Sequence, residues 1–386
     1  KMKKKTKSYK YFFRNMGLLF PFFLIIVFLI SIFMPERSFS EKENRVLASK
    51  PDATVSSLIS GQFEKKYDTY VNDQFPLRDM WVELKAGADF LMGKTRSNGV
   101  YLGKDGYLLE DFTPPVPEHL NATTEAMTSF AKAHSDIAQY ALIAPNAVNI
   151  LKDKLPAAAP VKDQNVYMDE LFSTLEQNGI SCIDVRNTFR QNTNHQLYYH
   201  TDHHWTTQAA YFAYKDAASK MGLDTSVCSY EQFPVTGSFQ GTLSAKSGFR
   251  SHEKEDIYVF LPKSDTPAHV VNYVDEQKKT ASFYAVEQLN VRDKYAMFFN
   301  GNHPLVRIST PIKEDRTLLV LKDSYANCMI PFLAPHYRNI IMVDPRYYYD
   351  DLEELIQVEN VQEILYLYNA NTFFSDTSLE MTLSPQ

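Results

Sequence analysis

The segment from Tyr198 to Thr207 gathers side chains that can move protons. It holds three of the ten histidines of the chain within five residues, with Asp202 among them. If this segment is extended ahead of a helix that begins near Thr206, alternate side chains point to opposite sides, so Asp202 and His204 share one side while His203 points away. A carboxylate beside a histidine orients the imidazole, fixes its tautomer and stabilises its protonated form. We therefore predict that Asp202 and His204 are the acid and base of a catalytic triad.

A candidate nucleophile lies where an apolar run ends. The run Thr317–Lys322 leads into Asp323 and Ser324 and then into a helical pattern from about Tyr325 to Leu333. Open α/β sheets carry their sites at the carboxyl ends of strands, and the first free N–H groups of a helix can stabilise an oxyanion. Either residue can instead simply cap the helix. Because the chain also supplies a base, we predict that Ser324 is the nucleophile.

Two other interpretations of the histidine-rich segment remain open. The first is metal binding, since zinc accepts these ligand types, by some of His195, His200, Asp202, His203 and His204. The second is a polar turn in which Asp202 or Thr201 caps the next helix. The matching serine segment favours the triad, and we expect neither a metal nor another cofactor.

A glycine-bearing loop, Phe298–Pro304, is a candidate oxyanion site. Gly301 lets a backbone N–H approach a reacting carbonyl, and the Asn302 amide can add a second donor. By itself, the loop would be an ordinary turn before the next strand. Trp205, beside the proposed base, is a candidate wall of the substrate pocket.

The intervening residues alternate between strand and helix patterns. Strands are predicted over 137–144, 180–185, 317–322, 339–343 and 363–368, and helices over 123–134, 168–178, 207–220, 325–333 and 352–358. Residues 99–109 are predicted to form a hairpin, and residues 230–299 short β segments that cap the sheet or bind substrate. Strands that alternate with helices form a largely parallel sheet covered on both faces. The predicted fold is therefore α/β with a β-rich insertion.

The first hundred residues predict a membrane-anchored chain. The segment 16–34 has no charge, and at about 1.5 Å per residue it nearly spans an apolar layer of about 30 Å. Basic residues precede it, so the positive-inside rule places the N-terminus in the cytoplasm and the residues after Arg37 outside. A cleaved signal peptide is the alternative, but its apolar core is usually only about 7–15 residues long.

We accordingly expect four parts: a basic cytoplasmic tail at 1–15, a single transmembrane helix at 16–34, a tether and helical stalk at 35–98, and a catalytic domain at 99–386. The net charge of −6 offers no basic surface for phosphates, which argues against nucleic acid as a partner.

The chain resembles the DHHW family, relatives of the alginate O-acetyltransferases within the SGNH (GDSL-like) hydrolase group. The resemblance begins with the signature Asp202-His203-His204-Trp205 and extends over most of the sequence after residue 37. It includes SEKENRVLASKP, VNDQFPLRD, YLGKDGYLL, FQGTLSAKSG, NGNHP, LKDSYAN and VDPRYY.

In those relatives, the Asp and His of a D-x-H-W motif and a later Ser form the triad, and these correspond here to Asp202, His204 and Ser324. Typical SGNH hydrolases place Asp and His after the serine, so the order here is permuted, but a triad is defined by geometry rather than by chain order. Arg346, within VDPRYY, is a candidate substrate contact or ion-pair partner.

The resemblance implies an SGNH-like fold and a function in O-acetylating an extracellular or cell-wall polysaccharide. It also implies a multi-pass membrane acyltransferase as the partner that delivers acyl groups. The mechanism would be ping-pong, through an acyl-enzyme that a sugar hydroxyl or water resolves. A glycan acetyl esterase with the same triad and a non-catalytic glycan-binding scaffold are the alternatives.

Overall fold

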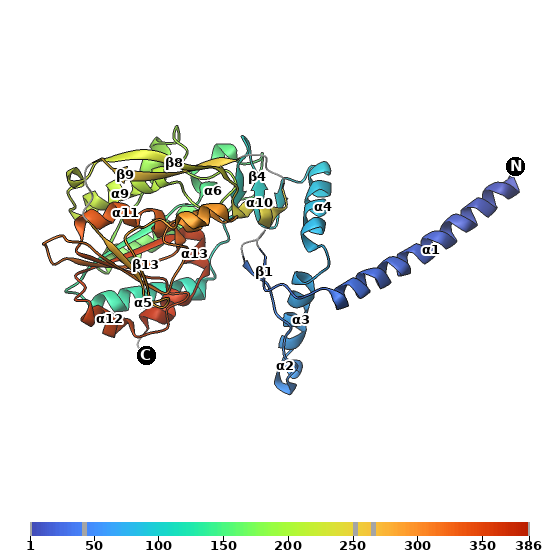
Figure 1. The fold of residues 1–386 in the computed structure, drawn as a ribbon, viewed down its shortest axis with the longest axis horizontal. Helices are drawn as coiled ribbons and strands as arrows, with labels where there is room; N and C mark the ends of the chain where they lie inside the picture. The colour runs from blue at the N-terminus through green and yellow to red at the C-terminus, as the bar shows by residue number, and fades with distance from the viewer. Residues whose placement is uncertain (1, 41–44, 250–253, 264–267, 385–386) are drawn as a thin grey trace. The chain divides into compact units, whose positions relative to one another are not determined.

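The computed structural model describes residues 2–40, 45–249, 254–263 and 268–384 (Figure 1). The chain divides into two compact units, Lys1–Met92 and Gly93–Gln386, which are described separately. Part of the SEKENRVLASKP segment, residues 41–44, lies outside the described residues.

The first unit is mainly helical. Helix α1 (Met2–Phe33) covers nearly all of the predicted anchor. Within the part of the chain that the structure describes, no helix meets the length and hydropathy needed to cross a membrane, so the anchor stays a prediction. After α1 come the short antiparallel strands β1 (Phe39–Ser40) and β2 (Arg45–Val46).

The region in which a helical stalk is expected contains α2 (Val55–Ile59), α3 (Gln62–Asp73) and α4 (Arg78–Leu91), while its role as a stalk stays a prediction. A reciprocal pair of hydrogen bonds joins the tether to the end of α3. The Arg37 N–H donates to Gln74 Oε1 at 3.0 Å, and Gln74 Nε2 donates to the Arg37 carbonyl at 2.9 Å. The segment that follows α1 is thereby held against the end of α3.

The second unit is built on a mixed eight-stranded sheet in the order β11-β10-β12-β14-β13-β15-β6-β7. Five neighbouring strands are parallel: β14 (Asn339–Val343), β13 (Thr317–Lys322), β15 (Glu363–Asn369), β6 (Ala138–Ala144) and β7 (Ile180–Cys182). The other three pair antiparallel at one edge: β12 (Leu305–Ser309), β10 (Val270–Tyr273) and β11 (Lys278–Thr280). The α/β fold is confirmed, but the prediction of a largely parallel sheet omitted this antiparallel edge.

Both faces of the sheet are covered, as predicted, and β13 shows why. Every residue of β13 is buried. Leu318 and Val320 join one apolar core, together with α9 (Thr207–Met221) and α11 (Ile330–Leu333), while Leu319 and Leu321 join the other. The second core also contains α5 (Pro117–Ala133), α7 (Gln164–Gln177) and α12 (Leu352–Val358). Figure 1 shows α9 and α11 on the opposite side of β13 from α5 and α12.

The β strands in the described part of residues 230–299 belong to two different sheets. Strands β8 (Tyr230–Phe239) and β9 (Glu255–Pro262) make a separate antiparallel pair, whereas β10 and β11 extend the main sheet. The sequence pattern could not distinguish these outcomes, because pairing partners are set by tertiary contacts.

The predicted hairpin at 99–109 is confirmed by β4 (Val100–Leu102) and β5 (Leu108–Glu110), which β3 (Arg96–Ser97) joins. Its turn uses left-handed backbone at Asp105 and Gly106, with φ of 54° and 80°. The remaining helices are α6 (Ala147–Ile150), α8 (Arg186–Gln191), α10 (Thr242–Ser247), α13 (Ala370–Ser375) and α14 (Ser378–Leu383).

Candidate active site

Ser324 lies immediately beyond the carboxyl end of β13, at the start of a 3-10 turn (Ser324–Cys328). The preceding Asp323 is fully buried and caps this turn: Oδ1 accepts from the Tyr325 N–H at 2.9 Å, and Oδ2 accepts from the Asn369 N–H at 2.9 Å. Asp323 thus ties the turn to the end of β15, and the Ser324 hydroxyl is left for another partner. The long helix predicted over 325–333 is instead this turn, followed by the short α11.

That partner is His204. Its Nε2 lies 2.7 Å from Ser324 Oγ, and its Nδ1 lies 2.5 Å from Asp202 Oδ1. The Asp202 carboxylate also accepts a hydrogen bond from the His204 backbone N–H at 3.0 Å, which fixes the imidazole relative to its own main chain. The structure therefore brings together the three residues predicted as a triad, although two of them are separated from the third by more than a hundred positions.

The orientation predicted for His203 is wrong. The residues from Thr201 to His204 form successive bends rather than an extended strand, so strict alternation does not apply. The His203 ring lies against that of His204, with centroids 3.9 Å apart, and its Nδ1 is 3.6 Å from Asp202 Oδ1. Its side chain is 31% exposed, compared with 8% for His204, so His203 is the histidine that faces solvent.

The far side of the Asp202 carboxylate is held by residues that sequence reasoning did not single out. Oδ2 accepts from the Thr242 N–H at 2.8 Å and from Thr242 Oγ1 at 3.1 Å. Gly241 packs so closely that an added Cβ would lie 2.2 Å from Asp202 Cβ. Both residues belong to FQGTLSAKSG, and that shared segment was the available signal.

Tyr295 was also missed. Its ring stacks on His204, with centroids 3.7 Å apart and planes inclined by 12°. Its hydroxyl donates to the Ser324 carbonyl at 3.4 Å, so a single side chain restrains both the base and the nucleophile segment. Tyr295 comes from a stretch with no recognisable motif, and only the folded chain shows its place.

The electrostatics of the site favour an ionised aspartate and a neutral histidine. Burial alone would raise the pKa of Asp202, but the charges of His203 and His204 and hydrogen bonding outweigh it and hold that pKa well below its usual value. The pKa of His204 is lowered, because burial and the neighbouring His203 charge disfavour the imidazolium more than Asp202 favours it. A neutral His204 beside an ionised Asp202 is the state in which a general base accepts a proton.

The loop with Gly301 and Asn302 is fastened to the Ser324 segment. Lys322 Nζ donates to Asn302 Oδ1 at 3.0 Å, and Asn327 Nδ2 donates to the same atom at 3.2 Å and to the Gly301 carbonyl at 3.1 Å. Lys322 is 1% exposed, and its second partner is Asp344 at 3.4 Å. The Asn302 amide is thereby oriented by its oxygen, while its Nδ2 makes no hydrogen bond to any residue that the structure describes.

Two other candidate residues have mainly structural environments. Trp205 is completely buried and donates from Nε1 to the Tyr325 carbonyl at 3.0 Å, so it supports the serine turn and does not wall an open pocket. Arg346 forms the ion pair considered from sequence: its Nε and one terminal nitrogen contact the Asp344 carboxylate at 2.8 and 2.6 Å. Its side chain remains 24% exposed.

The histidines of the metal alternative are only partly clustered. Asp202, His203 and His204 have potential ligand atoms within 4.8 Å of one another. His200 instead lies 2.9 Å from Glu255, and His195 packs edge-on against Phe212. The two outlying histidines thus have other environments, and the remaining three groups are those of the triad and its neighbour.

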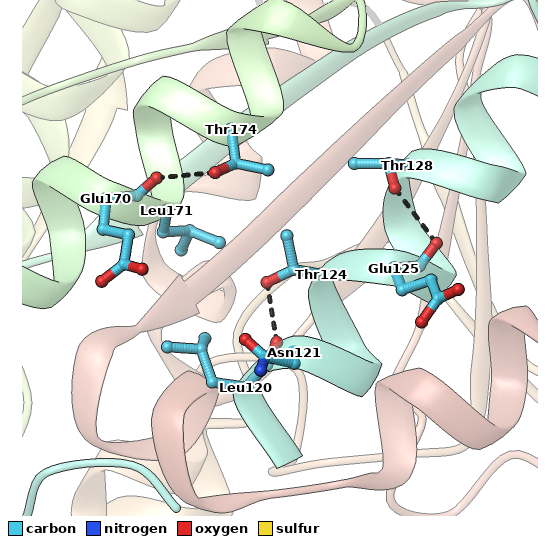
Figure 2. Close-up of a pocket in the computed structure, with 8 residues that line it drawn as sticks. All are labelled: Leu120, Asn121, Thr124, Glu125, Thr128, Glu170, Leu171 and Thr174. Atoms are coloured by element: carbon cyan, nitrogen blue, oxygen red, sulfur yellow. Dashed lines mark hydrogen bonds between the residues drawn. The ribbon is translucent and has the colours of Figure 1, made fainter. Parts of the chain in front are cut away.

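A separate pocket lies between α5 and α7 (Figure 2). Thr124, Thr128 and Thr174 face it, and each donates its hydroxyl to a carbonyl of its own helix, at 2.7–3.1 Å. The pocket contains no member of the Asp202–His204–Ser324 group, and its hydroxyl donors are already engaged.

The structure is thus that of an α/β protein in which a serine after a central parallel strand is hydrogen-bonded to a His–Asp pair. Sequence comparison then gives the family: the DHHW protein family matches residues 82–343, so the chain belongs to the DHHW family. Its sequence is also similar to the probable alginate O-acetylase AlgJ of Pseudomonas fluorescens, with 26% identity over 225 residues. That match covers 56% of this chain and 54% of AlgJ, so the chain spans about half the length of that relative.

Two solved structures share the fold. A DHHW family protein from Eubacterium siraeum superimposes with a TM-score of 0.64 at 19% identity, over 75% of this chain and 98% of its own. Bacillus cereus PatB1, solved with a sulfonyl adduct, gives a TM-score of 0.58 at 20% identity, over 72% of this chain and 98% of its own. These likenesses establish the architecture.

Proposed function

We propose that this chain is an O-acetyltransferase that modifies an extracellular or cell-wall polysaccharide through a serine-bound acyl intermediate. The observation that carries the proposal is the continuous hydrogen-bonded path from Asp202 through His204 to Ser324. Sequence similarity to a probable alginate O-acetylase supports acetyl transfer as the reaction. Residues 99–386 would be the SGNH-like catalytic domain.

In the first half-reaction, Ser324 Oγ attacks the carbonyl carbon of an acetyl donor while His204 Nε2 takes the hydroxyl proton. The tetrahedral intermediate collapses as His204 returns that proton to the oxygen of the departing donor. Asp202 stays ionised and stabilises the transient imidazolium, in line with its low pKa. The products are the acetylated Ser324 and the protonated leaving group.

In the second half-reaction, His204 takes a proton from a sugar hydroxyl, whose oxygen attacks the acetyl group on Ser324. The Ser324–acyl bond breaks, and Ser324 recovers its proton from His204. Water in place of the sugar gives hydrolysis, so the same residues serve a transferase and an esterase. A transferase must therefore bind the acceptor hydroxyl in place, where effective molarities can reach about 10⁵ M or more.

The oxyanion would be stabilised next to Ser324 by Asn302 Nδ2. The Gly301 N–H, the other predicted donor, already donates to the Phe298 carbonyl at 3.2 Å and would have to leave that bond to contribute. The support is the double anchoring of Asn302 Oδ1 by Lys322 and Asn327, which orients the amide through its oxygen and leaves its Nδ2 as the donor. A preorganised donor of this kind typically contributes about 10²–10³ in rate. Arg346 is proposed as a substrate contact only through the part of its side chain that stays exposed.

We further propose that residues 16–34 anchor the chain in the cell membrane and that the catalytic domain is extracytoplasmic. The support is the uncharged helical segment preceded by Lys3, Lys4, Lys5, Lys7, Lys10 and Arg14. In this arrangement, a multi-pass membrane acyltransferase would supply the acetyl group, and a surface polysaccharide would receive it. External protease on intact cells should digest the region after Arg37 and spare a tag placed ahead of Met16.

The nucleophile assignment is tested with the detergent-solubilised full chain. A chromogenic acetyl ester should be turned over, and a sulfonyl fluoride should stop turnover and add its sulfonyl mass to the peptide that contains Ser324. Ser324→Ala should take up no label. Label on another residue, or turnover unaffected by labelling at Ser324, refutes the assignment. Turnover that is lost with a chelator and restored by zinc would support the metal alternative.

Transfer is separated from hydrolysis by adding polysaccharide acceptors together with an isotopically labelled acetyl donor. A transferase diverts label from free acetate to the glycan, which mass spectrometry detects as acetylated oligosaccharide. If the native polymer only loses acetate, a deacetylating esterase remains. If a folded chain neither turns over esters nor reacts with the sulfonyl fluoride, the scaffold alternative is favoured.

A further inference from the structure

The loop that carries Asp202 is held by a buried carboxylate that the proposed reaction does not use. Glu255 is the first residue of β9, and its side chain is 4% exposed. Its Oε1 accepts from the Thr201 N–H at 3.0 Å and from Thr201 Oγ1 at 3.1 Å. Its Oε2 accepts from the His200 N–H at 2.7 Å and from Gln196 Nε2 at 2.6 Å. Both oxygens are therefore occupied by one short segment, 196–201.

A hydrogen-bonded path leads from this carboxylate to the triad. Thr201 Oγ1, which donates to Glu255, accepts from the Gly241 N–H at 2.8 Å. Gly241 packs against Asp202, and the next residue, Thr242, donates to Asp202 Oδ2 at 2.8 Å. Thr201 therefore joins Glu255 to the segment that fixes the outer face of the Asp202 carboxylate.

The β8–β9 pair brings both ends of this path to the same place. Phe239 at the end of β8 pairs with Glu255 at the start of β9. The chain after Phe239 leads to Gly241 and Thr242, while Glu255 points its carboxylate at the loop from the other strand. The β8–β9 pair thus contacts the loop that carries Asp202 and His204 through Glu255 of β9 and through the residues that follow β8.

We propose that Glu255 is a positioning residue, which sets the orientation of Asp202 and through it the tautomer of His204. The β8–β9 pair then supports the acid–base half of the site and is more than a cover for the sheet. The expected fall in kcat rests on the proposed function. The expected change in the His204 tautomer does not.

The proposal depends on the carboxylate having two accepting oxygens. Hydrogen bonds to an ionised acceptor are about twice as strong as neutral ones, and a buried donor left without an acceptor is costly. In Glu255→Gln, one end of the side chain becomes an NH₂ group and meets donors from either Thr201 or His200. Whichever way the amide turns, one edge of the segment loses its acceptor while side-chain volume is kept.

The matched control is Asp256→Asn. Asp256 follows Glu255 on the same strand, is exposed, and accepts from the Tyr258 hydroxyl at 3.0 Å. Successive strand residues point to opposite faces, so the control removes a neighbouring charge from β9 and keeps the hydrogen bonds of Glu255 to segment 196–201.

The first measurement is nitrogen-15 NMR of histidine-labelled full chain in detergent, with the His204 signals assigned by their loss in His204→Gln. The native chain and Asp256→Asn should show one neutral tautomer with the proton on Nδ1, and Glu255→Gln a mixture. The second measurement is ester kinetics: kcat should fall about 10²-fold in Glu255→Gln, as for other small misplacements of catalytic groups. KM should be unchanged, because Glu255 does not reach substrate.

A folded Glu255→Gln with the native tautomer and native kcat would overturn the proposal. If that variant does not fold, Thr201→Val removes the joining hydroxyl at nearly constant volume and should give the same mixture; a native spectrum in folded Thr201→Val would also overturn it. If the native chain turns over no ester, the proposed function fails, but the NMR comparison still decides the role of Glu255.

Discussion

Gly241→Ala should damage catalysis through a steric effect whose size can be worked out. The backbone of Gly241 has φ of −83° and ψ of −178°, which alanine adopts without strain, so the backbone conformation itself does not require glycine. The added Cβ, however, would lie 2.2 Å from Asp202 Cβ and 2.6 Å from its Cα. Carbon atoms pack best at about 3.5–4.0 Å, so the two segments must separate by roughly 1.3–1.8 Å.

A displacement of that size moves Asp202 away from His204, and a misplacement of about 1 Å can cost about 10²-fold in rate. We therefore expect kcat/KM for an acetyl ester to fall by at least about 10²-fold, with about 1–3 kcal/mol lost from the free energy of unfolding through overpacking. Gly87→Ala is the matched control, because its added Cβ has no neighbour within 4 Å. It should keep the native rate.

The assay combines denaturant unfolding with ester kinetics on the same preparations. The reasoning is refuted if folded Gly241→Ala keeps the native kcat/KM. It is also refuted if Gly241→Ala and Gly87→Ala lose equal activity, since the effect would then not arise from contact with Asp202.

The remaining predictions concern the triad and its supports. Ser324→Ala should abolish ester turnover with little change in melting temperature, because one half-buried hydroxyl contributes little to stability; residual turnover in the folded variant would exclude Ser324 as nucleophile. His204→Ala should cost several orders of magnitude in kcat, and His203→Ala far less, because only His204 reaches Ser324 Oγ; equal losses would contradict this division. Burial lowers the pKa of His204, and a general base works when it is neutral. Turnover should therefore rise with pH through a midpoint below 6.5. A midpoint above pH 7 would argue against His204 as the base. Lys322→Met should lower kcat more than it changes KM, because Lys322 orients Asn302. It should also lower the free energy of unfolding by about 1–3 kcal/mol, because Lys322 is buried and Asn302 and Asp344 would each lose a hydrogen bond. Native kinetics in this variant would remove Asn302 from the oxyanion proposal.

The sequence by itself indicated the alternating α/β elements and singled out Asp202, His204 and Ser324 as a candidate triad, and the structure brings these three side chains within hydrogen-bonding distance. The run Thr317–Lys322 is apolar over its four central residues, because a central parallel strand is buried on both faces, and such a run can be recognised without tertiary information. The short hairpin at 99–109 was equally predictable, since Asp105 and Gly106 are residues that adopt left-handed backbone readily. Local signals of this kind depend on residue type and spacing, which the sequence contains in full.

Only the tertiary structure decided which strands pair and what surrounds the triad. The antiparallel edge formed by β12, β10 and β11 follows from long-range contacts, and strand propensity does not choose partners. His203 was misplaced from sequence because bends replace the extended backbone on which alternation depends.

Tyr295 and Glu255 carry no motif, yet the fold stacks one on His204 and joins the other to the loop before Asp202. Their positions depend on how β8, β9 and the segments after them pack in three dimensions. Residue spacing along the chain does not contain that information, because the groups that meet here come from segments far apart in sequence.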